Sequence, residues 1–277
     1  MFDREAIKAL SEAQSIAAAA EAVTSALAAD AAVAMLPSDF THHDLEKFLP
    51  TRRRARGSMK TSSITDFGTY VKSHKEEGAS VFVAQDTMTA TAVLNLGTPA
   101  APGHADNTAV LALKATAAYT ALSNIASGHP KSQRDVAEWL EDWANIVTAI
   151  DADEQPIHIK HAIAAVRAIT IDAARKVESE ERSLSATRSA LEQVTASSKG
   201  QPLPALLSVE LEPYMGLEPR TFAVRVGVLT TGDKQPQLVL RIVKAEQHAE
   251  EMALELAALV RTELGDVPAT LGAYQAK

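Results

Sequence analysis

The chain has 277 residues, of which 46% are hydrophobic and 22% charged, with a formal net charge of −8 and no cysteine. This is the composition of a soluble globular protein, and the absence of cysteine excludes disulfides, thiolate metal sites and cysteine nucleophiles. The acidic balance argues against a protein that coats nucleic acid with its whole surface, while it leaves room for a local basic contact.

The N-terminal region predicts a long helix. Residues 3–35 contain fourteen alanines and no glycine or proline, a composition with high helix propensity. Residues spaced alternately three and four positions apart form a seam along this helix, and most of them are small. Such a helix gains the most stability when it packs closely against another helix. The partner is either its own domain or a second subunit. For contact between subunits, we expect the interface to include Leu10, Ala13, Ala17, Ala20 and Leu27.

The same region does not resemble a targeting segment. It carries acidic residues and lacks a basic head that leads into an unbroken apolar stretch, so we expect no secretory signal. No apolar run in the sequence approaches the roughly 20 residues that span a bilayer, and we expect no membrane association.

A basic segment lies between two predicted short helices. Thr41 and Asp44 resemble a capping box for a helix that Pro50 stops, and Ser63 and Asp66 repeat this pattern for a helix closed by Gly78. The segment 51–60 between them carries five positive charges and no acid. Its basic residues are Arg52, Arg53, Arg54, Arg56 and Lys60.

Strands and a further helix are predicted in the middle of the chain. Residues 81–83 and 89–95 form a hairpin, with 108–114 as a third strand beyond a Gly/Pro-rich loop. A helix begins with Ser132 as its cap and continues through apolar positions to Ile150. The acidic stretch 151–156 then breaks that helix, and it marks the expected boundary between halves.

The C-terminal part again mixes helices and strands. We expect a helix over 158–170, strands over 205–212, 222–228 and 238–242, and a final helix over 246–264. Residues 176–195 fit a solvated helix or two exposed strands. The separated blocks of helices and hairpins indicate an α+β architecture. The expected regions are an N-terminal helix at 1–36, an α+β core at 37–155 and a second α+β region at 156–277.

Common catalytic and cofactor motifs are absent. The twelve glycines form neither a Walker loop nor a dinucleotide fingerprint, and no serine lies in a nucleophile elbow. His158 and His161 are spaced to present two imidazoles to one metal, with His104 or His129 as a third candidate that cannot be placed. Such a pair is more often simply solvated. We therefore expect no catalytic residue, no cofactor and no metal site.

The basic segment has two interpretations. Its four arginines could clamp phosphates bidentately in a contact that does not read bases and that salt abolishes. Alternatively they pair with carboxylates, within the subunit or across a subunit interface, as a charged connector between two short helices. The acidic surplus of the chain favours the second interpretation.

The basic segment also belongs to a stretch that resembles a known family. The resemblance is carried by 44–57, 66–71, 81–83, 91–95, the Pro102-Gly103-His104 motif, and 132–142 with Trp139 where the family tends to have phenylalanine. In these segments the chain is similar to the YfdQ-like family of phage and prophage proteins, which has no known function. This resemblance implies a phage-encoded protein in the host bacterial cytoplasm, transfers no catalytic residue, and favours strands over 176–195.

Three hypotheses about function follow. The leading one is a non-enzymatic phage accessory protein that assembles into a homo-oligomer through its N-terminal helix. The second is a nucleic-acid- or nucleotide-binding module, associated with anti-defence or recombination, that uses the basic segment. The third is a metal-dependent hydrolase built on His158 and His161.

Overall fold

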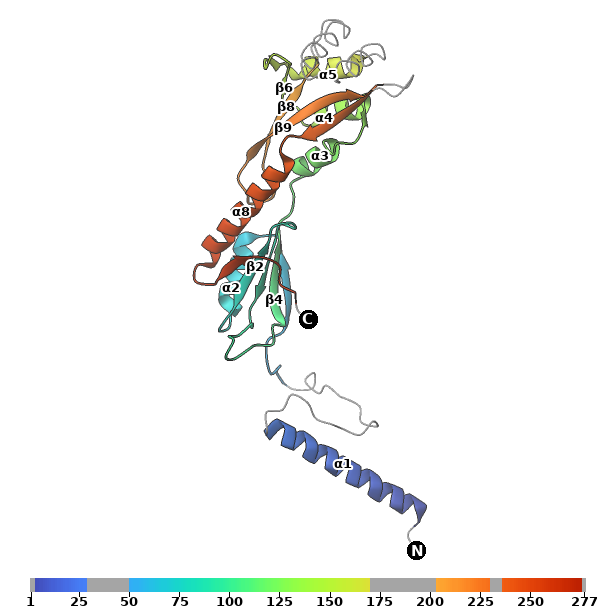
Figure 1. The fold of residues 1–277 in the computed structure, drawn as a ribbon, viewed down its shortest axis with the longest axis vertical. Helices are drawn as coiled ribbons and strands as arrows, with labels where there is room; N and C mark the ends of the chain where they lie inside the picture. The colour runs from blue at the N-terminus through green and yellow to red at the C-terminus, as the bar shows by residue number, and fades with distance from the viewer. Residues whose placement is uncertain (1–2, 29–49, 170–202, 230–235, 276–277) are drawn as a thin grey trace. The chain divides into compact units, whose positions relative to one another are not determined.

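The computed structural model describes residues 3–28, 50–169, 203–229 and 236–275 (Figure 1). By their contacts, the residues divide into two compact units, Met1–Ala55 and Arg56–Lys277. The helix α1 (Arg4–Ala28) is the described element of the first unit, and the remaining elements belong to the second. The architecture is α+β, as the sequence predicts.

The helix α1 confirms the predicted N-terminal helix over its 25 residues. Lys8 and Glu12 form an exposed ion pair one turn apart, with 3.9 Å between Nζ and Oε1. The hydroxyl of Ser15 donates to the carbonyl oxygen of Ser11 at 2.9 Å. Because a helix has about 3.6 residues per turn, these four residues share one side of α1, opposite the small-residue seam.

The second unit contains a five-stranded sheet in the order β1-β4-β3-β2-β11. The predicted hairpin and third strand are confirmed, because β2–β3 and β3–β4 pair antiparallel. The two edge strands pair parallel with their neighbours and were not predicted. The strands are β1 (Gly57–Thr61), β2 (Ser80–Ala84), β3 (Thr89–Val93), β4 (Asn107–Ala112) and β11 (Ala269–Leu271).

Two helices, α2 (Ile64–His74) and α8 (Ala245–Leu264), pack on this sheet and on each other. The side chain of Ser63 caps α2 by accepting from the backbone N of Asp66 at 3.2 Å, as predicted. The predicted end of this helix near Gly78 is wrong. The helix ends at His74 because Lys75 adopts an extended conformation. Gly265 caps α8 as expected.

The other sheet has six antiparallel strands in the order β5-β10-β9-β8-β6-β7. The predicted strands near 205–212, 222–228 and 238–242 are confirmed. In each of them buried and more exposed residues alternate, as expected for a sheet with one buried face. The strands are β5 (Lys131–Ser132), β6 (Val147–Ile150), β7 (Pro156–Ile157), β8 (Leu206–Leu211), β9 (Arg220–Leu229) and β10 (Gln237–Ile242).

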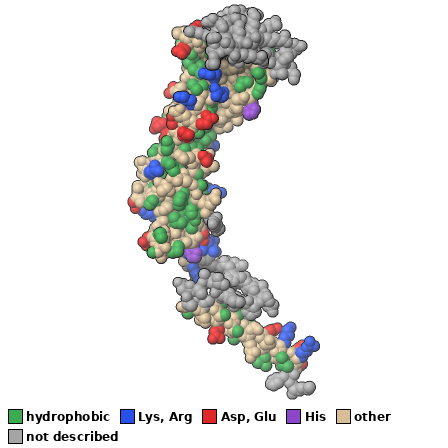
Figure 2. Space-filling model, in the orientation of Figure 1, with side chains coloured by type: hydrophobic (Ala, Val, Ile, Leu, Met, Phe, Trp, Pro, Cys, Tyr) green, Lys and Arg blue, Asp and Glu red, His purple; other side chains and the backbone are tan. Residues whose placement is uncertain are grey.

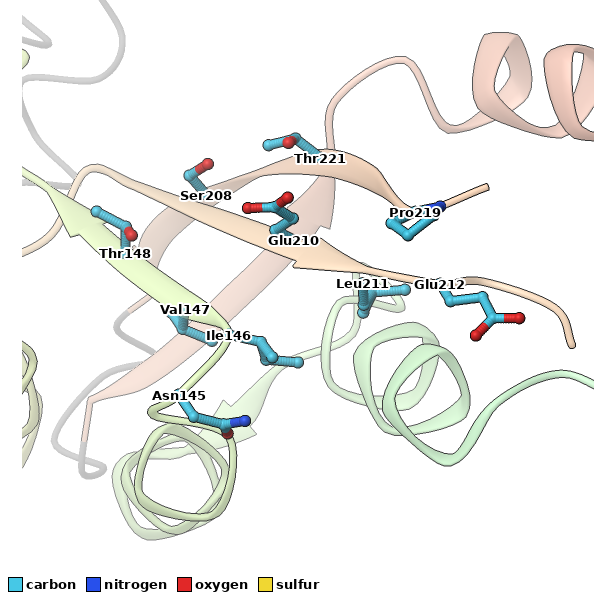
Figure 3. A pocket seen from close by; sticks show the side chains of 10 residues that line it. All are labelled: Asn145, Ile146, Val147, Thr148, Ser208, Glu210, Leu211, Glu212, Pro219 and Thr221. Carbon is cyan, nitrogen blue, oxygen red and sulfur yellow. The ribbon is translucent and has the colours of Figure 1, made fainter. Parts of the chain in front are cut away.

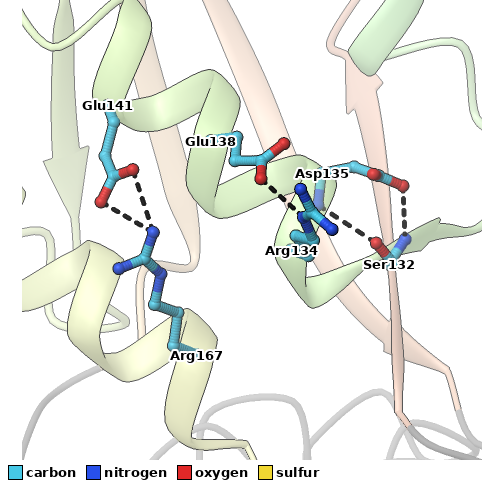
Figure 4. Close-up of polar contacts among 6 residues, drawn as sticks. All are labelled: Ser132, Arg134, Asp135, Glu138, Glu141 and Arg167. Atoms are coloured by element: carbon cyan, nitrogen blue, oxygen red, sulfur yellow. Dashed lines mark hydrogen bonds and ion pairs between the residues drawn. The ribbon is translucent and has the colours of Figure 1, made fainter.

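One face of this sheet is buried against α3 (Ala117–Ile125), α4 (Gln133–Asp142) and α5 (Ile159–Ala168). A reciprocal capping box joins Ser132 and Asp135 at the start of α4 (Figure 4). Figure 4 also shows the ion pairs of this layer. Arg134 bonds Glu138 one turn further along α4 at 2.6 Å, and Arg167 of α5 bonds Glu141 of α4 at 2.9 Å.

The structure corrects the predicted extent of the helix that begins after Ser132. That helix ends at Asp142, and residues 147–150 form the strand β6. Val147 and Ile150 fit the helical spacing of the residues before them. Val147 and Ala149 are buried on either side of the exposed Thr148, in the alternating pattern of a strand, and pairing with β8 stabilises this strand. The helix α3 was not predicted, although Thr116 caps it through the backbone N of Tyr119.

The acidic stretch after β6 is a hairpin turn within the six-stranded sheet. Oδ1 of Asp151 accepts from the backbone N of Asp153 at 2.9 Å and of Gln155 at 2.8 Å. The strands on its two sides pair with each other, Ile150 lying opposite Pro156. The expected boundary between 37–155 and 156–277 therefore falls within a hairpin.

The two sheets of the second unit are connected by side chains from α3, α8 and β9. The ring of Tyr119 lies 5.4 Å from that of Phe222 and 5.5 Å from that of Tyr214. Burial, followed by the nearby Tyr214, raises the pKa of the Tyr119 phenol above its ordinary value. Arg220 of β9 forms an ion pair with Glu255 of α8, and both side chains are largely buried.

Several sequence predictions fall outside the described residues. They are the end of the N-terminal helix beyond residue 28, the helix at 41–49 with its histidines, the segment 176–195, and the turn at 231–234.

Candidate functional site

The first candidate site is the apolar side of α1. Leu10 has 55% of its surface exposed, and the three seam alanines Ala13, Ala17 and Ala20 are also exposed. Larger apolar residues flank the seam on both sides, and these too are exposed: Ile7, Ile16 and Val23. Leu27 lies within α1, but its side chain is outside the described part. The structure thus places four of the five predicted interface residues on an exposed apolar surface.

The second candidate site is the basic segment, which extends from the first unit into the second. Arg52, Arg53 and Arg56 are exposed and Arg54 is half-buried. Arg53, Arg54 and Arg56 each have an interaction partner. Lys60 is exposed on β1, opposite Val110 of β4.

The end of the basic segment is an ordered strand, where the sequence predicted a charged connector between two short helices. Gly57 begins the strand β1, and its backbone N donates to the carbonyl oxygen of Asp106 at 2.9 Å. Parallel pairing with β4 fixes the chain from Gly57 to Thr61. Arg56 therefore lies directly before an ordered edge strand, and the predicted connector between two helices is wrong for residues 57–61.

Beside this strand, two buried asparagines hold the end of the five-stranded sheet. Asn95 and Asn107 each have only 5% of their surface exposed. Oδ1 of Asn95 accepts from the backbone N of Asn107 at 3.0 Å, and its Nδ2 donates to Oδ1 of Asp106 at 3.0 Å. Buried polar groups require such partners, so Asn95 has a structural role here.

The Pro102-Gly103-His104 motif contributes to the same packing. The backbone N of Gly103 donates to the carbonyl oxygen of Leu96 at 2.9 Å. A Cβ on Gly103 would lie 2.0 Å from the carbonyl oxygen of Asn95, so only glycine fits. His104 is exposed. The motif thus forms a tight loop at the end of the sheet.

A third candidate site is a hollow beside β6, β8 and β9 of the six-stranded sheet, lined by residues from both sides of the sheet (Figure 3). Its volume is about 470 Å³. Figure 3 shows Thr148, Ser208, Glu210 and Thr221 on one side of the strands and Val147 on the other. Sequence reasoning missed this hollow, and its only signal was the polar residue at every second position of each strand.

The predicted histidine pair lies at the start of α5. Nδ1 of His158 accepts from the backbone N of Lys160 at 3.3 Å, so this residue caps the helix. The rings of His158 and His161 are 5.7 Å apart. In the described ranges, no group of three or more histidine, aspartate or glutamate side chains is placed to hold a metal ion. His104 and His129 are exposed on other segments.

The described residues form an α+β protein with two sheets. The chain belongs to a family described as "Uncharacterized conserved protein (DUF2303)", which matches residues 4–274. This match confirms the predicted membership of a conserved family without an assigned function. No curated protein matches the chain, and neither does any solved structure. None of the helices in the described ranges is long and apolar enough to cross a membrane.

Proposed function

We propose that the protein is a non-enzymatic accessory protein that assembles with copies of itself through α1. Its similarity to the YfdQ-like phage and prophage proteins supports a phage origin and action in the host bacterial cytoplasm. The observation that carries the proposal is the exposed apolar side of α1.

The energetics favour burial of that side. Ile7, Leu10 and Ile16 each have more than half of their surface exposed, and burying one such side chain fully contributes roughly 1.5–3 kcal/mol. The small residues of the seam allow two helices to approach closely, so that the flanking isoleucines contact the partner as well. The charged side with Lys8 and Glu12 stays in water. Association of two α1 helices thus removes apolar surface from water and leaves the Lys8–Glu12 ion pair outside the contact.

Glutamate substitutions on α1 test the proposal. Leu10→Glu and Ile16→Glu each place a charge in the contact, and we expect each to lower the average mass measured by light scattering at a given protein concentration. Ser15→Glu adds the same charge on the opposite side of the helix and should leave the mass unchanged. A native protein that keeps the mass of one chain at every concentration would contradict the proposal.

A second candidate function is phosphate binding by the basic segment. The exposure of Arg52, Arg53, Arg56 and Lys60 favours it, because guanidinium groups bind phosphate oxygens bidentately. Such a contact would serve an anti-defence or recombination-associated module.

The test of this candidate is replacement of the four arginines by alanine. We expect binding to duplex DNA, RNA or nucleotides at low salt to be lost in the variant, and binding by the native protein to fall steeply as salt increases. Unchanged binding by the variant across salt concentrations would refute phosphate recognition by this segment.

A further inference from the structure

The side of the six-stranded sheet that faces away from α3, α4 and α5, hereafter the open face, carries cations in one row and an acidic residue two rows away. Along β9, residues Phe222 and Val224 point into the core, so the residues between them belong to the open face. The pairing of β9 with its neighbours then places the open-face residues in rows across the sheet. Three successive rows differ sharply in chemistry.

The first row has two cations on β9 and β10, followed by the half-buried Leu206 and Ile150 on β8 and β6. Arg225 of β9 lies directly opposite Arg241 of β10, and both side chains are exposed. Directly opposite residues have Cβ atoms about 5 Å apart, where like charges destabilise the sheet. Within the described ranges, neither guanidinium has an ion pair. Figure 2 shows several Lys and Arg side chains gathered on the upper part of the second unit.

The middle row consists of small side chains. Ala223 lies opposite Ser208, and Ser208 lies opposite Thr148. Side chains of this size allow another surface to approach the sheet closely. Packed sheets are about 10 Å apart even with ordinary side chains between them.

The third row is acidic and concave. Glu210 lies opposite Thr221, and both line the hollow of about 470 Å³ (Figure 3). Glu212 also lines it, and its Oε1 accepts from the backbone N of Gly216 at 2.7 Å. In the part of the chain that the structure describes, the carboxylate of Glu210 has no cationic partner. The hollow combines hydroxyl groups with a negative charge, which suits a guanidinium.

From this arrangement we infer that the open face binds the open face of a second copy, related by a twofold axis. The inference rests on the proposed self-assembly and adds a contact separate from α1. The twofold axis lies between the two facing sheets, runs perpendicular to the strands and passes over the middle row. Rotation about this axis places the cationic row of each copy over the acidic row of the other. Arg225 then enters the partner's hollow beside Glu210. Such an isologous contact forms every charge pair twice.

A charge-swap experiment tests this contact in the intact chain carrying Leu10→Glu, which weakens the α1 contact. The double variant Arg225→Glu, Arg241→Glu and the single variant Glu210→Arg each place like charges across the axis. We expect the mass from sedimentation to show at least tenfold weaker self-association for each variant. Mixing the two variants should restore association, because one copy is then acidic in both of these rows and the other copy is cationic in both.

A matched control reverses two cations elsewhere. Arg134 and Lys160 are exposed on α4 and α5, which cover the opposite side of the sheet. Replacing both by glutamate changes the net charge as much as the Arg225/Arg241 double variant does, and should leave association unchanged. Circular dichroism of each variant verifies the native fold.

The outcomes separate the two proposals. If Leu10→Glu lowers the mass of the native protein but the swaps on the open face do not, the open-face contact is wrong and assembly through α1 stands. If the native protein is a monomer at all concentrations, both fail. If the Arg225/Arg241 variant loses binding to duplex DNA while its self-association is unchanged, the cationic row binds phosphate and the inference is overturned.

Discussion

Gly78 and Gly128 have the same positive φ of 77° in different surroundings. A Cβ on Gly78 would lie 2.1 Å from the carbonyl oxygen of Gly97, whereas one on Gly128 would meet no atom within 4 Å. Gly97 in turn packs against Gly103, where its own Cβ would lie 2.3 Å from the backbone N. The end of the five-stranded sheet thus depends on glycines from three segments.

We expect Gly78→Ala to destabilise the fold more than Gly128→Ala. Both substitutions incur the left-handed backbone strain of about 1–2 kcal/mol, but only Gly78→Ala adds a clash with backbone atoms that cannot move independently. Urea unfolding of the two variants measures the difference. Equal losses of stability would show that the loop containing Gly97 can shift to admit the extra carbon.

For single residues, the sequence predicts those contacts that join residues close together in the chain. The caps Ser63 and Ser132 were predicted and confirmed, because each bonds a backbone N three residues away. Asn95 was not recognised as a buried polar residue. Its partners Asp106 and Asn107 follow 11 and 12 residues later, across a loop whose path the sequence does not reveal.

Between elements, the seam of α2 and α8 is connected by two ion pairs. Nζ of Lys72 is 2.9 Å from Oε1 of Glu263, and Nζ of Lys75 is 2.5 Å from Oδ2 of Asp266. The hydrogen bond from Lys75, followed by its charge, lowers the pKa of the Asp266 carboxyl below its ordinary value. The carboxylate therefore favours the folded state wherever it is ionised.

Lys75→Met should consequently reduce stability in a pH-dependent way. A lowered carboxyl pKa contributes stability above the pKa of the unfolded chain, and this contribution is lost as the pH falls through the lowered pKa. We expect the native protein to be slightly more stable than the variant at neutral pH, and the two to converge in acid. A stability difference that stays constant from neutral to acidic pH would contradict this ion-pair account.

Pairing between elements limits what the sequence predicts. The alternating strands β8, β9 and β10 were recognised, whereas β1 and β11 were not, because each pairs parallel with a strand that is distant in the chain. The seam of α1 was predicted from its spacing. The opposition of Arg225 and Arg241 was not predicted, because it depends on the register between two strands.

For the whole molecule, the proposed self-assembly has two candidate surfaces. The apolar side of α1 and the open face of the six-stranded sheet belong to different compact units. Two self-contacts on separate units can link more than two copies, whereas either contact alone gives a dimer when it is isologous. An assembly larger than a dimer is therefore the expected form of the protein at high concentration.

The most direct test is the mass of the intact native protein, measured by sedimentation equilibrium over a wide range of concentrations. Self-assembly predicts a mass that rises with concentration to a multiple of one chain and that falls when Leu10 is replaced by glutamate. A mass equal to that of one chain throughout the range would contradict it.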